Sequence, residues 1–289
     1  MVEVVVTGAS GFIGRAVCAE LAARGVSVMG VGRSADPEIR GVPYVRVAGY
    51  EEFRPPRNAR CLHLACSTRF REGSMETHPD CFEAVQLVRA ILHQGYDRVV
   101  LASSALVYGD HVPRPRREDE PVQPTGAYAR MKLAVETEVL ACRQTVARLS
   151  NVYGPRMQTG TALSDILQQL PDSAAPLRVR DTSPVRDYLY LEDAGKGLAD
   201  LVLAEEAEGI VNLGTGIGTS VGELARQCLV LAGQADRPVV GRHASERIST
   251  VIVDPGKAAR QLGWRAERSL VTGLKGMVEP RTQQALHAG

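Results

Sequence analysis

The sequence lacks an excess of charge of either sign. Its 289 residues carry a formal net charge of +1 with 23% charged residues, and no long block of like charge occurs in the chain. Strongly basic patches mark proteins that bind nucleic acids or membrane surfaces, so we expect neither kind of partner. A hydrophobic fraction of 44% is enough for a full core, which predicts one large domain or two unequal lobes.

The sequence also lacks the cysteine spacings of metal and redox motifs. No CxxC pair occurs among its six cysteines, and no histidine partner stands at zinc-finger spacing, so we interpret them as free thiols and predict no metal. The first residues, MVEVVVTGAS, have no basic start and turn polar after a strand-length apolar run. This pattern fits neither a signal peptide nor a membrane span, and we expect a cytoplasmic protein. Lysine is scarce, with four among 34 basic residues, so each lysine is worth inspection.

Short apolar runs alternate with amphipathic stretches through the first half of the chain. Strands are expected at residues 2–7, 26–31, 44–47, 61–65, 98–102 and 146–149, and helices at 12–24, 82–92 and 127–140. This alternation predicts an α/β fold with a doubly wound parallel sheet. Beyond it the elements are shorter and richer in proline and glycine, so we divide the chain into a main domain, 1–150, and a smaller substrate lobe, 151–289. Residues 188–203 and 210–213 again fit a helix and a strand, so part of about 185–213 is expected to return to the main domain.

A glycine-rich turn separates the first expected strand from the first expected helix. Gly8, Gly11 and Gly14 stand at the first, fourth and seventh positions of the segment GASGFIG. The first glycine permits a tight turn, the second lets a pyrophosphate approach the backbone, and the third allows close helix packing, while the start of the helix offers N–H donors. In this strand-to-helix context the motif predicts a dinucleotide site rather than a purely structural turn.

The end of the second expected strand indicates which dinucleotide binds. An acidic residue there would bind the ribose hydroxyls of NAD, but this chain has Gly32 followed by Arg33. A guanidinium suits bidentate contact with a phosphate, so we predict NADP(H), with NAD(H) as the second choice. Arg15 is a candidate for a second phosphate contact. The competing interpretation of Arg33 is a surface arginine without a cofactor role.

Tyr128 and Lys132 form a candidate catalytic pair. They lie four residues apart in the helix expected at 127–140, so their side chains share one face. A phenol with a pKa of about 10 is a poor proton donor or acceptor near neutral pH, and an adjacent ammonium lowers that pKa by stabilising the phenolate. Ser104 ends an earlier apolar strand, where its hydroxyl could meet the same substrate oxygen.

These motifs resemble those of extended short-chain dehydrogenases/reductases of the NAD-dependent epimerase/dehydratase family. The segments that carry the resemblance are TGASGFIG (7–14), HLA (63–65), SSALVYG (103–109), YARMK (128–132), NVYGPR (151–156) and RDYLYLED (186–193). The resemblance implies a Rossmann domain with a small carboxy-terminal lobe that often binds nucleotide-linked sugars, and a homodimer through the helix that carries Tyr128. It also implies that Tyr128 is the general acid or base, that Lys132 holds the nicotinamide ribose, and that Ser104 orients the reacting oxygen.

The turn and the resemblance together give the expected contacts of both ligands. The cofactor is expected to contact Gly8, Ser10, Gly11, Phe12, Ile13, Gly14, Arg33, Leu64, Ala65, Tyr128 and Lys132. The resemblance implies that the substrate contacts Ser104, Asn151 and Arg186, with Arg242 or Arg247 completing a clamp on a diphosphate. The alternatives are a loop cap for Asn151 and surface salt bridges for the arginines. We leave His63 out of the catalytic set, because a histidine in this strand motif more often packs or hydrogen-bonds locally.

Departures from the family pattern narrow the expected reaction. Members that eliminate water, decarboxylate, or epimerise beside a keto group resemble one another in acidic or cysteine residues just after the catalytic hydroxyl, where this chain has Ala105 and Leu106. We therefore expect an NADPH-dependent ketoreductase that acts on a nucleotide-linked keto-sugar, such as a dTDP-4-keto-6-deoxyhexose. The alternatives are a nucleotide-sugar epimerase and a non-catalytic dinucleotide-sensing protein.

Overall fold

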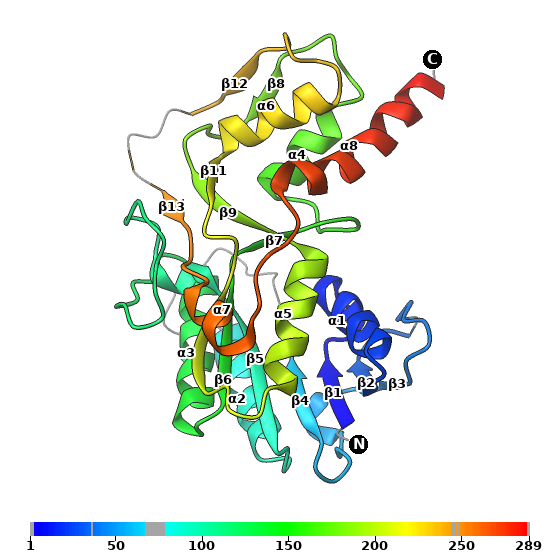
Figure 1. The fold of residues 1–289 in the computed structure, drawn as a ribbon, viewed down its shortest axis with the longest axis vertical. Helices are drawn as coiled ribbons and strands as arrows, with labels where there is room; N and C mark the ends of the chain where they lie inside the picture. Colours follow the sequence, from blue (N-terminus) through cyan, green and yellow to red (C-terminus); the bar gives the residue numbers. More distant parts are fainter. Residues whose placement is uncertain (1–2, 36, 67–78, 244–246, 248, 288–289) are drawn as a thin grey trace.

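The computed structural model describes residues 3–35, 37–66, 79–243, 247 and 249–287. Two lobes lie one above the other in Figure 1, with the amino terminus in the lower lobe and the carboxy terminus at the upper one. The elements are β1 (Glu3–Thr7), α1 (Phe12–Ala23), β2 (Ser27–Gly32), β3 (Tyr44–Arg46), the 3-10 helix η1 (Tyr50–Glu52), β4 (Arg60–His63), α2 (Pro79–Leu92), β5 (Arg98–Ser104), the 3-10 helix η2 (Ala105–Tyr108), α3 (Ala127–Ala141), β6 (Thr145–Leu149), β7 (Asn151–Tyr153), α4 (Ala162–Gln169), β8 (Leu177–Val179), β9 (Val185–Tyr190), α5 (Leu191–Leu203), β10 (Gly209–Leu213), β11 (Gly218–Ser220), α6 (Val221–Leu231), β12 (Val239–Gly241), β13 (Thr250–Val251), α7 (Gly256–Leu262) and α8 (Leu270–His287).

A seven-stranded sheet forms the centre of the lower lobe. Its strands follow the order β10-β6-β5-β4-β1-β2-β3, and every neighbouring pair is parallel. The chain order reverses between β1 and β4, and such a switch point opens a crevice at the carboxyl ends of the strands. The predicted Rossmann-type, doubly wound parallel sheet is therefore confirmed.

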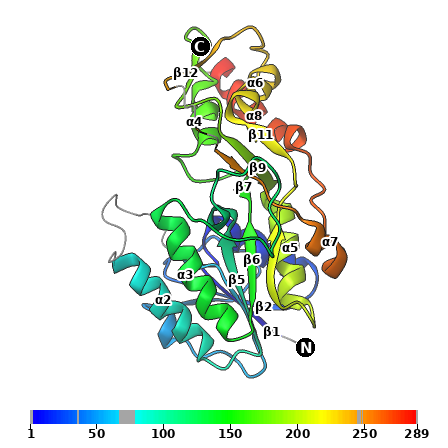
Figure 2. The ribbon, with the colours of Figure 1, turned by 90° about the vertical axis from the view of Figure 1, so that its left-hand side faces the viewer.

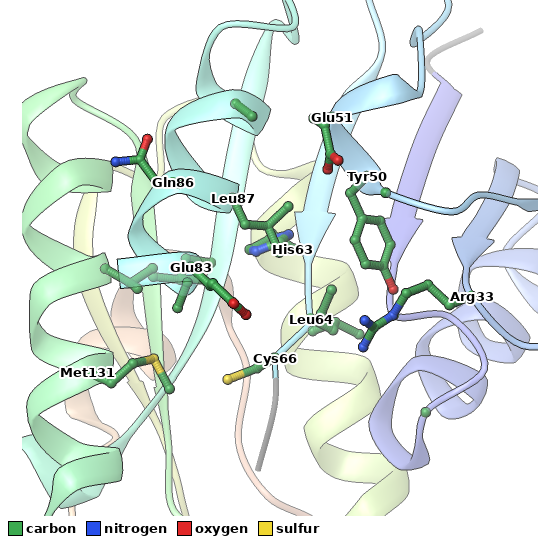
Figure 3. Close-up of a pocket in the computed structure, with 18 of the residues that line it drawn as sticks. Arg33, Tyr50, Glu51, His63, Leu64, Cys66, Glu83, Gln86, Leu87 and Met131 are labelled. Atoms are coloured by element: carbon green, nitrogen blue, oxygen red, sulfur yellow. The ribbon is translucent and has the colours of Figure 1, made fainter. Parts of the chain in front are cut away.

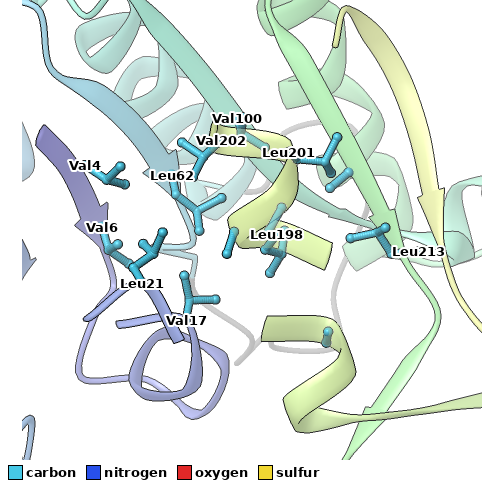
Figure 4. Close-up of a cluster of buried hydrophobic side chains, with 14 of the residues drawn as sticks. Val4, Val6, Val17, Leu21, Leu62, Val100, Leu198, Leu201, Val202 and Leu213 are labelled. Carbon is cyan, nitrogen blue, oxygen red and sulfur yellow. The ribbon is translucent and has the colours of Figure 1, made fainter. Parts of the chain in front are cut away.

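Helices cover both faces of this sheet, and alternate residues of each strand face them. Val4 and Val6 of β1 pack with Leu21 of α1 and Leu198 of α5 in one hydrophobic core, which Figure 4 shows. Val5, which lies between the two, faces a second core on the opposite side. Figure 2 shows α2 and α3 together on one side of the sheet and α5 on the other. Burial on both sides explains why these strands are nearly continuous apolar runs in the sequence.

The chain crosses between the lobes more than once. After β6, strand β7 pairs with β9 in the upper lobe, and β10 then adds to the main sheet beside β6. The sequence pattern placed a helix over residues 188–203, but α5 begins only at Leu191. The first three residues of that range end β9, because Tyr188 and Tyr190 face the core of the upper lobe while Leu189 faces that of the lower lobe. That alternation is the two-residue period of a strand.

The upper lobe has a core of its own. Strands β11, β9 and β13 form a sheet with β7 beside β9, and α4, α6 and α8 pack near it. The ring of Tyr153 stands edge-on to those of Tyr188 and Tyr190, at centroid distances of 6.2 and 5.4 Å. Among the helices in the described ranges, none is long and apolar enough to cross a membrane.

Candidate active site

The turn between β1 and α1 requires glycine for reasons of space. Gly8 has a φ of +71°, and a Cβ on it would lie 2.8 Å from the backbone nitrogen of Ala65, just after β4. A Cβ on Gly14 would overlap the carbonyl oxygen of Gly8, so α1 packs directly on the turn. The N-cap residue of α1, Gly11, has no side chain to cap the helix, and no acidic residue occupies its first turn. The N–H groups at the start of α1 are therefore suited to an anionic ligand.

A cavity of about 930 Å³ opens beside this turn, at the switch point between β1 and β4. Its volume lies near the upper end of the range for small-molecule and cofactor sites, about 300–1,000 Å³. In Figure 3, Arg33 and Tyr50 lie on one side of this groove, and Glu83 and Met131 lie on the other. Of the expected cofactor residues, those that line the groove are Gly8, Ser10, Gly11, Arg33, Leu64, Ala65 and Lys132. Phe12, Ile13 and Gly14 begin α1 directly behind the turn.

Arg33, just after β2, and Tyr50 of η1 place a cation and a phenol at one end of the groove. The hydroxyl of Tyr50 lies beside the guanidinium of Arg33 in Figure 3. Burial raises the pKa of Tyr50, and the charge of Arg33 partly opposes this effect. Sequence reasoning missed Tyr50, because its position in the groove depends on the fold after β3. Arg15 donates a hydrogen bond to the carbonyl oxygen of Ser10 at 2.8 Å, so it braces the glycine turn rather than reaching toward Arg33.

Helix α3 carries Tyr128 and Lys132, and strand β5 ends at Ser104. The Nζ of Lys132 donates to the carbonyl oxygen of Ala102 at 2.8 Å, which ties the helix to the strand. Because β5 and β6 are parallel, the helix that connects them runs antiparallel to both. Tyr128 precedes Lys132 by about 6 Å along the helix axis. Ser104 follows Ala102 by about 6.6 Å along the strand, in the same direction, so Tyr128 and Ser104 both lie toward the carboxyl end of the sheet from the Lys132–Ala102 contact.

Burial and charge act in opposite directions on the Tyr128–Lys132 pair. The Nζ of Lys132 lies 5.8 Å from the centroid of the Tyr128 ring. Burial lowers the pKa of Lys132, but Tyr128, Cys66 and Glu136 raise it, and the net direction is upward. Burial raises the pKa of Tyr128, and Lys132 opposes that rise without cancelling it. Lys132 therefore lowers the pKa of Tyr128 as expected, but burial of the phenol outweighs that effect, so the net direction is upward.

Two adjacent serines at the end of β5 have different roles. Ser103 is buried, and its hydroxyl donates to the carboxylate of Glu136. The Oγ of Ser104 accepts a hydrogen bond from the backbone N–H of Leu106 at 3.2 Å, which caps η2. A hydroxyl that accepts in this way can still donate its own proton. Ser104 therefore suits hydrogen bonding to a substrate oxygen, whereas Ser103 is committed to the protein interior.

A buried ion pair lies one helical turn beyond Lys132, below the candidate site. Glu136 and Arg148 are 0% and 3% exposed and approach to 2.7 Å. The guanidinium of Arg148 lies 4.5 Å from the ring centroid of Tyr108, whose hydroxyl donates to Asn212 at 2.9 Å. This network joins α3, β6, η2 and β10. The network was not predicted from the sequence, although Glu136 lies four residues after Lys132 on the same helix face, which is a signal that could have indicated it.

The expected substrate arginines lie near an internal carboxylate. Asp110 is 7% exposed, forms an ion pair with Arg247 and accepts from the hydroxyl of Ser249 at 2.8 Å. Ser249 accepts in turn from Nη2 of Arg186 at 2.9 Å. Thus Arg186 and Arg247 are brought together through Asp110. Arg242 follows β12, where its backbone N–H donates to Val179 of β8, and Asn151 begins β7 directly after the main-sheet strand β6.

His63 and the cysteines have local environments. The Nδ1 of His63 and the Oγ1 of Thr7 are 2.8 Å apart in the interior. Burial, together with the charge of Lys132, lowers the pKa of His63 to about 3, so its ring is neutral at physiological pH. None of the six cysteines forms a disulfide. Within the described part of the chain, no group of three or more histidine, cysteine, aspartate or glutamate side chains could hold a metal ion.

Known proteins resemble this chain along nearly its whole length. The model of the NAD dependent epimerase/dehydratase family matches residues 4–214. The UDP-glucose 4-epimerase of Bacillus subtilis strain 168 is 26% identical over 319 aligned positions, which cover 92% of this chain and 93% of that protein. MoeE5, solved in complex with UDP-glucuronic acid and NAD, has a TM-score of 0.82 at 26% identity, covering 98% of this chain and 99% of that one. A Thermus thermophilus UDP-glucose 4-epimerase in complex with NAD has a TM-score of 0.79 at 26% identity, and the match covers 96% of this chain and 98% of that one.

Proposed function

The chain belongs to the NAD-dependent epimerase/dehydratase family, and from this premise we propose that it is a redox epimerase of a nucleotide-linked sugar. Two relatives that align along nearly the whole chain, those of Bacillus subtilis and Thermus thermophilus, are UDP-glucose 4-epimerases, and they support this function better than the ketoreductase that was expected first. The observation that carries the proposal is the hydrogen bond from Lys132 to Ala102, because it ties α3, the helix of Tyr128, to β5, the strand that ends at Ser104.

The groove fits a nicotinamide dinucleotide. The glycines leave a cradle at Gly8 and Gly14 that a Cβ would fill, and the start of α1 offers N–H donors to a pyrophosphate. We propose that the turn and Arg33 hold the adenosine half, and that Lys132 holds the nicotinamide ribose. When bound, the dinucleotide supplies a reversible acceptor for hydride.

The side chains of the site supply the proton transfers of an epimerisation. Tyr128 takes the proton of the sugar hydroxyl while the hydroxyl of Ser104 donates to the same oxygen. The ammonium of Lys132 would stabilise the phenolate, and Tyr128 would give the proton back to the same oxygen in the reverse step. No neighbouring carbon is deprotonated in this scheme. Ala105 and Leu106, which cannot transfer protons, are consistent with that requirement.

We place the substrate's nucleotide diphosphate against the upper lobe. Arg186 and Arg247 are cationic and are held together at the boundary between the lobes. Asn151 begins β7 at the carboxyl end of β6, where it would face a ligand that spans both lobes. Guanidinium groups bind phosphate oxygens through strong, charge-assisted hydrogen bonds. The upper lobe is therefore proposed as the substrate lobe.

A second candidate is the NADPH-dependent ketoreductase, which the end of β2 favours. Gly32 offers no carboxylate for the ribose hydroxyls of NAD, and Arg33 suits a phosphate. A reductant that is exchanged in every cycle would be used by a reductase. An epimerase instead returns the hydride to the same sugar.

Cofactor stoichiometry separates the two candidates. The purified protein would be incubated with UDP- and dTDP-linked hexoses without added cofactor, and the sugars followed by NMR. Interconversion of two epimers without net change in reduced nicotinamide is expected. A second incubation would contain 4-deuterated NADPH and nucleotide-linked 4-keto-6-deoxy sugars. Consumption of one NADPH per product, with deuterium on the former carbonyl carbon, would establish the ketoreductase instead. Neither outcome across the panel would overturn both proposals.

A further inference from the structure

A tyrosine hydroxyl occupies the space beside Gly32. A Cβ built on Gly32 would lie 2.6 Å from Oη of Tyr44 and 3.4 Å from Oγ of Ser10. Gly32 ends β2, at the position where an acidic side chain would bind the ribose hydroxyls of NAD. A carboxylate cannot enter that space unless Tyr44 moves, because its first carbon would already overlap the phenol oxygen.

The pairing of β2 with β3 fixes Tyr44 in this position. The two strands are parallel, with Gly30 opposite Tyr44. A Cβ on Gly30 would lie 3.2 Å from Cδ2 of the Tyr44 ring, closer than ordinary packing. Gly30 and Gly32 share one face of the strand, because they are two residues apart. The tyrosine ring therefore crosses β2 over the first glycine, and its hydroxyl reaches the second, at the carboxyl end of the sheet.

The surroundings of this hydroxyl favour an anion. Arg33 and Ser10 both line the groove next to Gly32. The hydroxyl of Tyr44 contacts the carbonyl oxygen of Ser34 at 3.4 Å, longer than the usual 2.5–3.0 Å of an O–H···O bond, so its proton can turn to a stronger acceptor. Glu51 also lines the groove. Its carboxylate, however, packs against Gly49, in the space that a Cβ on Gly49 would fill.

We infer that Tyr44 is a specificity-determining residue for the cofactor, whose hydroxyl replaces the carboxylate beside Gly32 and donates to the 2′-phosphate of NADP. Arg33 binds the same phosphate, and Ser10 lies within reach of it. A carboxylate at this point would repel the phosphate, whereas a phenol can donate to it. The pair Gly32–Tyr44 thus determines cofactor choice together with Arg33. This inference rests on the proposed function only in placing a dinucleotide in the groove, and it holds for an epimerase and a reductase alike.

Cofactor binding without any sugar tests the inference. Dissociation constants of NADPH and NADH would be measured by their fluorescence on the purified full chain. Tyr44→Phe keeps the ring over Gly30 and removes only the hydroxyl. It should weaken NADPH about tenfold, as expected for a lost hydrogen bond to a charged group, and change NADH by less than about twofold. Tyr96→Phe, which removes a buried phenol from the other face of the sheet, is the matched control and should change neither constant.

A double substitution tests the coupling between the two positions. Gly32→Asp alone should weaken both dinucleotides, because the new carboxylate overlaps the hydroxyl of Tyr44. Gly32→Asp combined with Tyr44→Ala should bind NADH more tightly than the single variant does and should prefer NADH to NADPH. Thermal melting of each variant reports whether it folds. If the two variants with Gly32→Asp do not fold, Tyr44→Phe alone still tests the inference.

Three results would overturn the inference while leaving the proposed function intact. They are a Tyr44→Phe protein with the wild-type ratio of NADPH to NADH affinity, a Gly32→Asp protein that binds NADH as well as the double variant does, and a wild type that binds NADH as tightly as NADPH. Binding of neither dinucleotide to the wild type would overturn the proposed function and the inference together.

Discussion

The carboxylate of Asp110 accepts a hydrogen bond from the hydroxyl of Ser249 at 2.8 Å, across the boundary between the two lobes. Asp110 follows η2, only six residues after Ser104, whereas Ser249 directly precedes β13 of the upper lobe. One oxygen of Asp110, Oδ1, is buried without a hydrogen-bond partner among the described residues. The same carboxylate pairs with Arg247, so a negative charge already lies beside the arginines proposed for the substrate diphosphate.

Asp110→Asn should therefore strengthen the binding of a nucleoside diphosphate. Loss of the carboxylate leaves the charges of Arg186 and Arg247 available to phosphate oxygens, and we expect UDP to bind about 3–10-fold more tightly, equivalent to about 1 kcal/mol. Isothermal titration calorimetry measures this constant. Asp172→Asn removes the same charge from an exposed turn and should leave it unchanged. Weaker or unaltered binding by Asp110→Asn would contradict the prediction.

Tyr128→Phe should remove catalysis and preserve cofactor binding. The substitution keeps the ring and deletes only the proton-transferring group, so we expect kcat to fall by ~10²–10⁴-fold. Steady-state rates and the dissociation constant of the dinucleotide are the two measurements. Tyr96→Phe again serves as the control. Near-normal turnover in Tyr128→Phe would exclude Tyr128 as the acid or base.

Loss of the charge on Lys132 should move the pH profile. Burial raises the pKa of Tyr128 and Lys132 lowers it, so Lys132→Met removes the lowering effect and the pKa rises further. The rate of sugar oxidation depends on the deprotonated phenol, and its rising limb should shift to higher pH. Rates at saturating cofactor across the pH range measure this shift. Lys132→Arg keeps the charge, so the rising limb of its pH–rate profile should shift less. A Lys132→Met protein whose rising limb lies at the wild-type pH would refute the role of Lys132 in lowering the pKa of Tyr128.

The Glu136–Arg148 pair should contribute strongly to stability. Both side chains are almost fully buried, so Glu136→Gln leaves an uncompensated guanidinium in the interior. We expect the free energy of unfolding to fall by about 3–5 kcal/mol, measured by urea denaturation. Arg89 and Glu138 form an exposed pair on α2 and α3, so Glu138→Gln, the matched control, should lower the stability far less than Glu136→Gln does. Equal losses in the two variants would show that burial does not govern the difference.

His63 should make the protein sensitive to acid. Its pKa is lowered to about 3 in the folded state, from a usual value of 6.5, so the unfolded chain binds a proton first as pH falls. The free energy of unfolding should therefore decrease as the pH falls from about 6.5 to 3. At pH 5 the loss relative to the value above pH 6.5 should be about 2 kcal/mol. His63→Gln removes this contribution, so its unfolding free energy should fall less than that of the wild type between pH 7 and pH 5. Parallel losses in both proteins would contradict the lowered pKa.

Features that depend on short stretches of sequence were predictable. The glycine turn follows from spacing within residues 8–14, and the strands of the sheet follow from apolar runs that are buried on both faces. The doubly wound parallel sheet and the family resemblance are confirmed. The helical face shared by Tyr128 and Lys132 is likewise local, because it needs only a four-residue separation.

Features that depend on strand pairing and burial were not predictable. Tyr44 reaches Gly32 only because β3 pairs in parallel with β2 in the register that sets Gly30 opposite Tyr44. The pattern of residues within either strand does not predict that register. Asp110 and Ser249 are 139 residues apart in the chain. The net direction of the Tyr128 pKa depends on how deeply the phenol is buried, and the sequence gives its neighbour Lys132 but not that depth.

The return of α5 and β10 to the main sheet limits how this protein can be cut and recombined. Strand β6 is buried along its whole length, and β10 covers one of its edges. A fragment ending at residue 150 would expose that edge as a template for pairing with other chains, and we expect such a fragment to aggregate. Transplanting the upper lobe from a relative, to change the sugar that is accepted, therefore requires replacing separate segments on both sides of α5 and β10 while leaving those two elements with their original sheet.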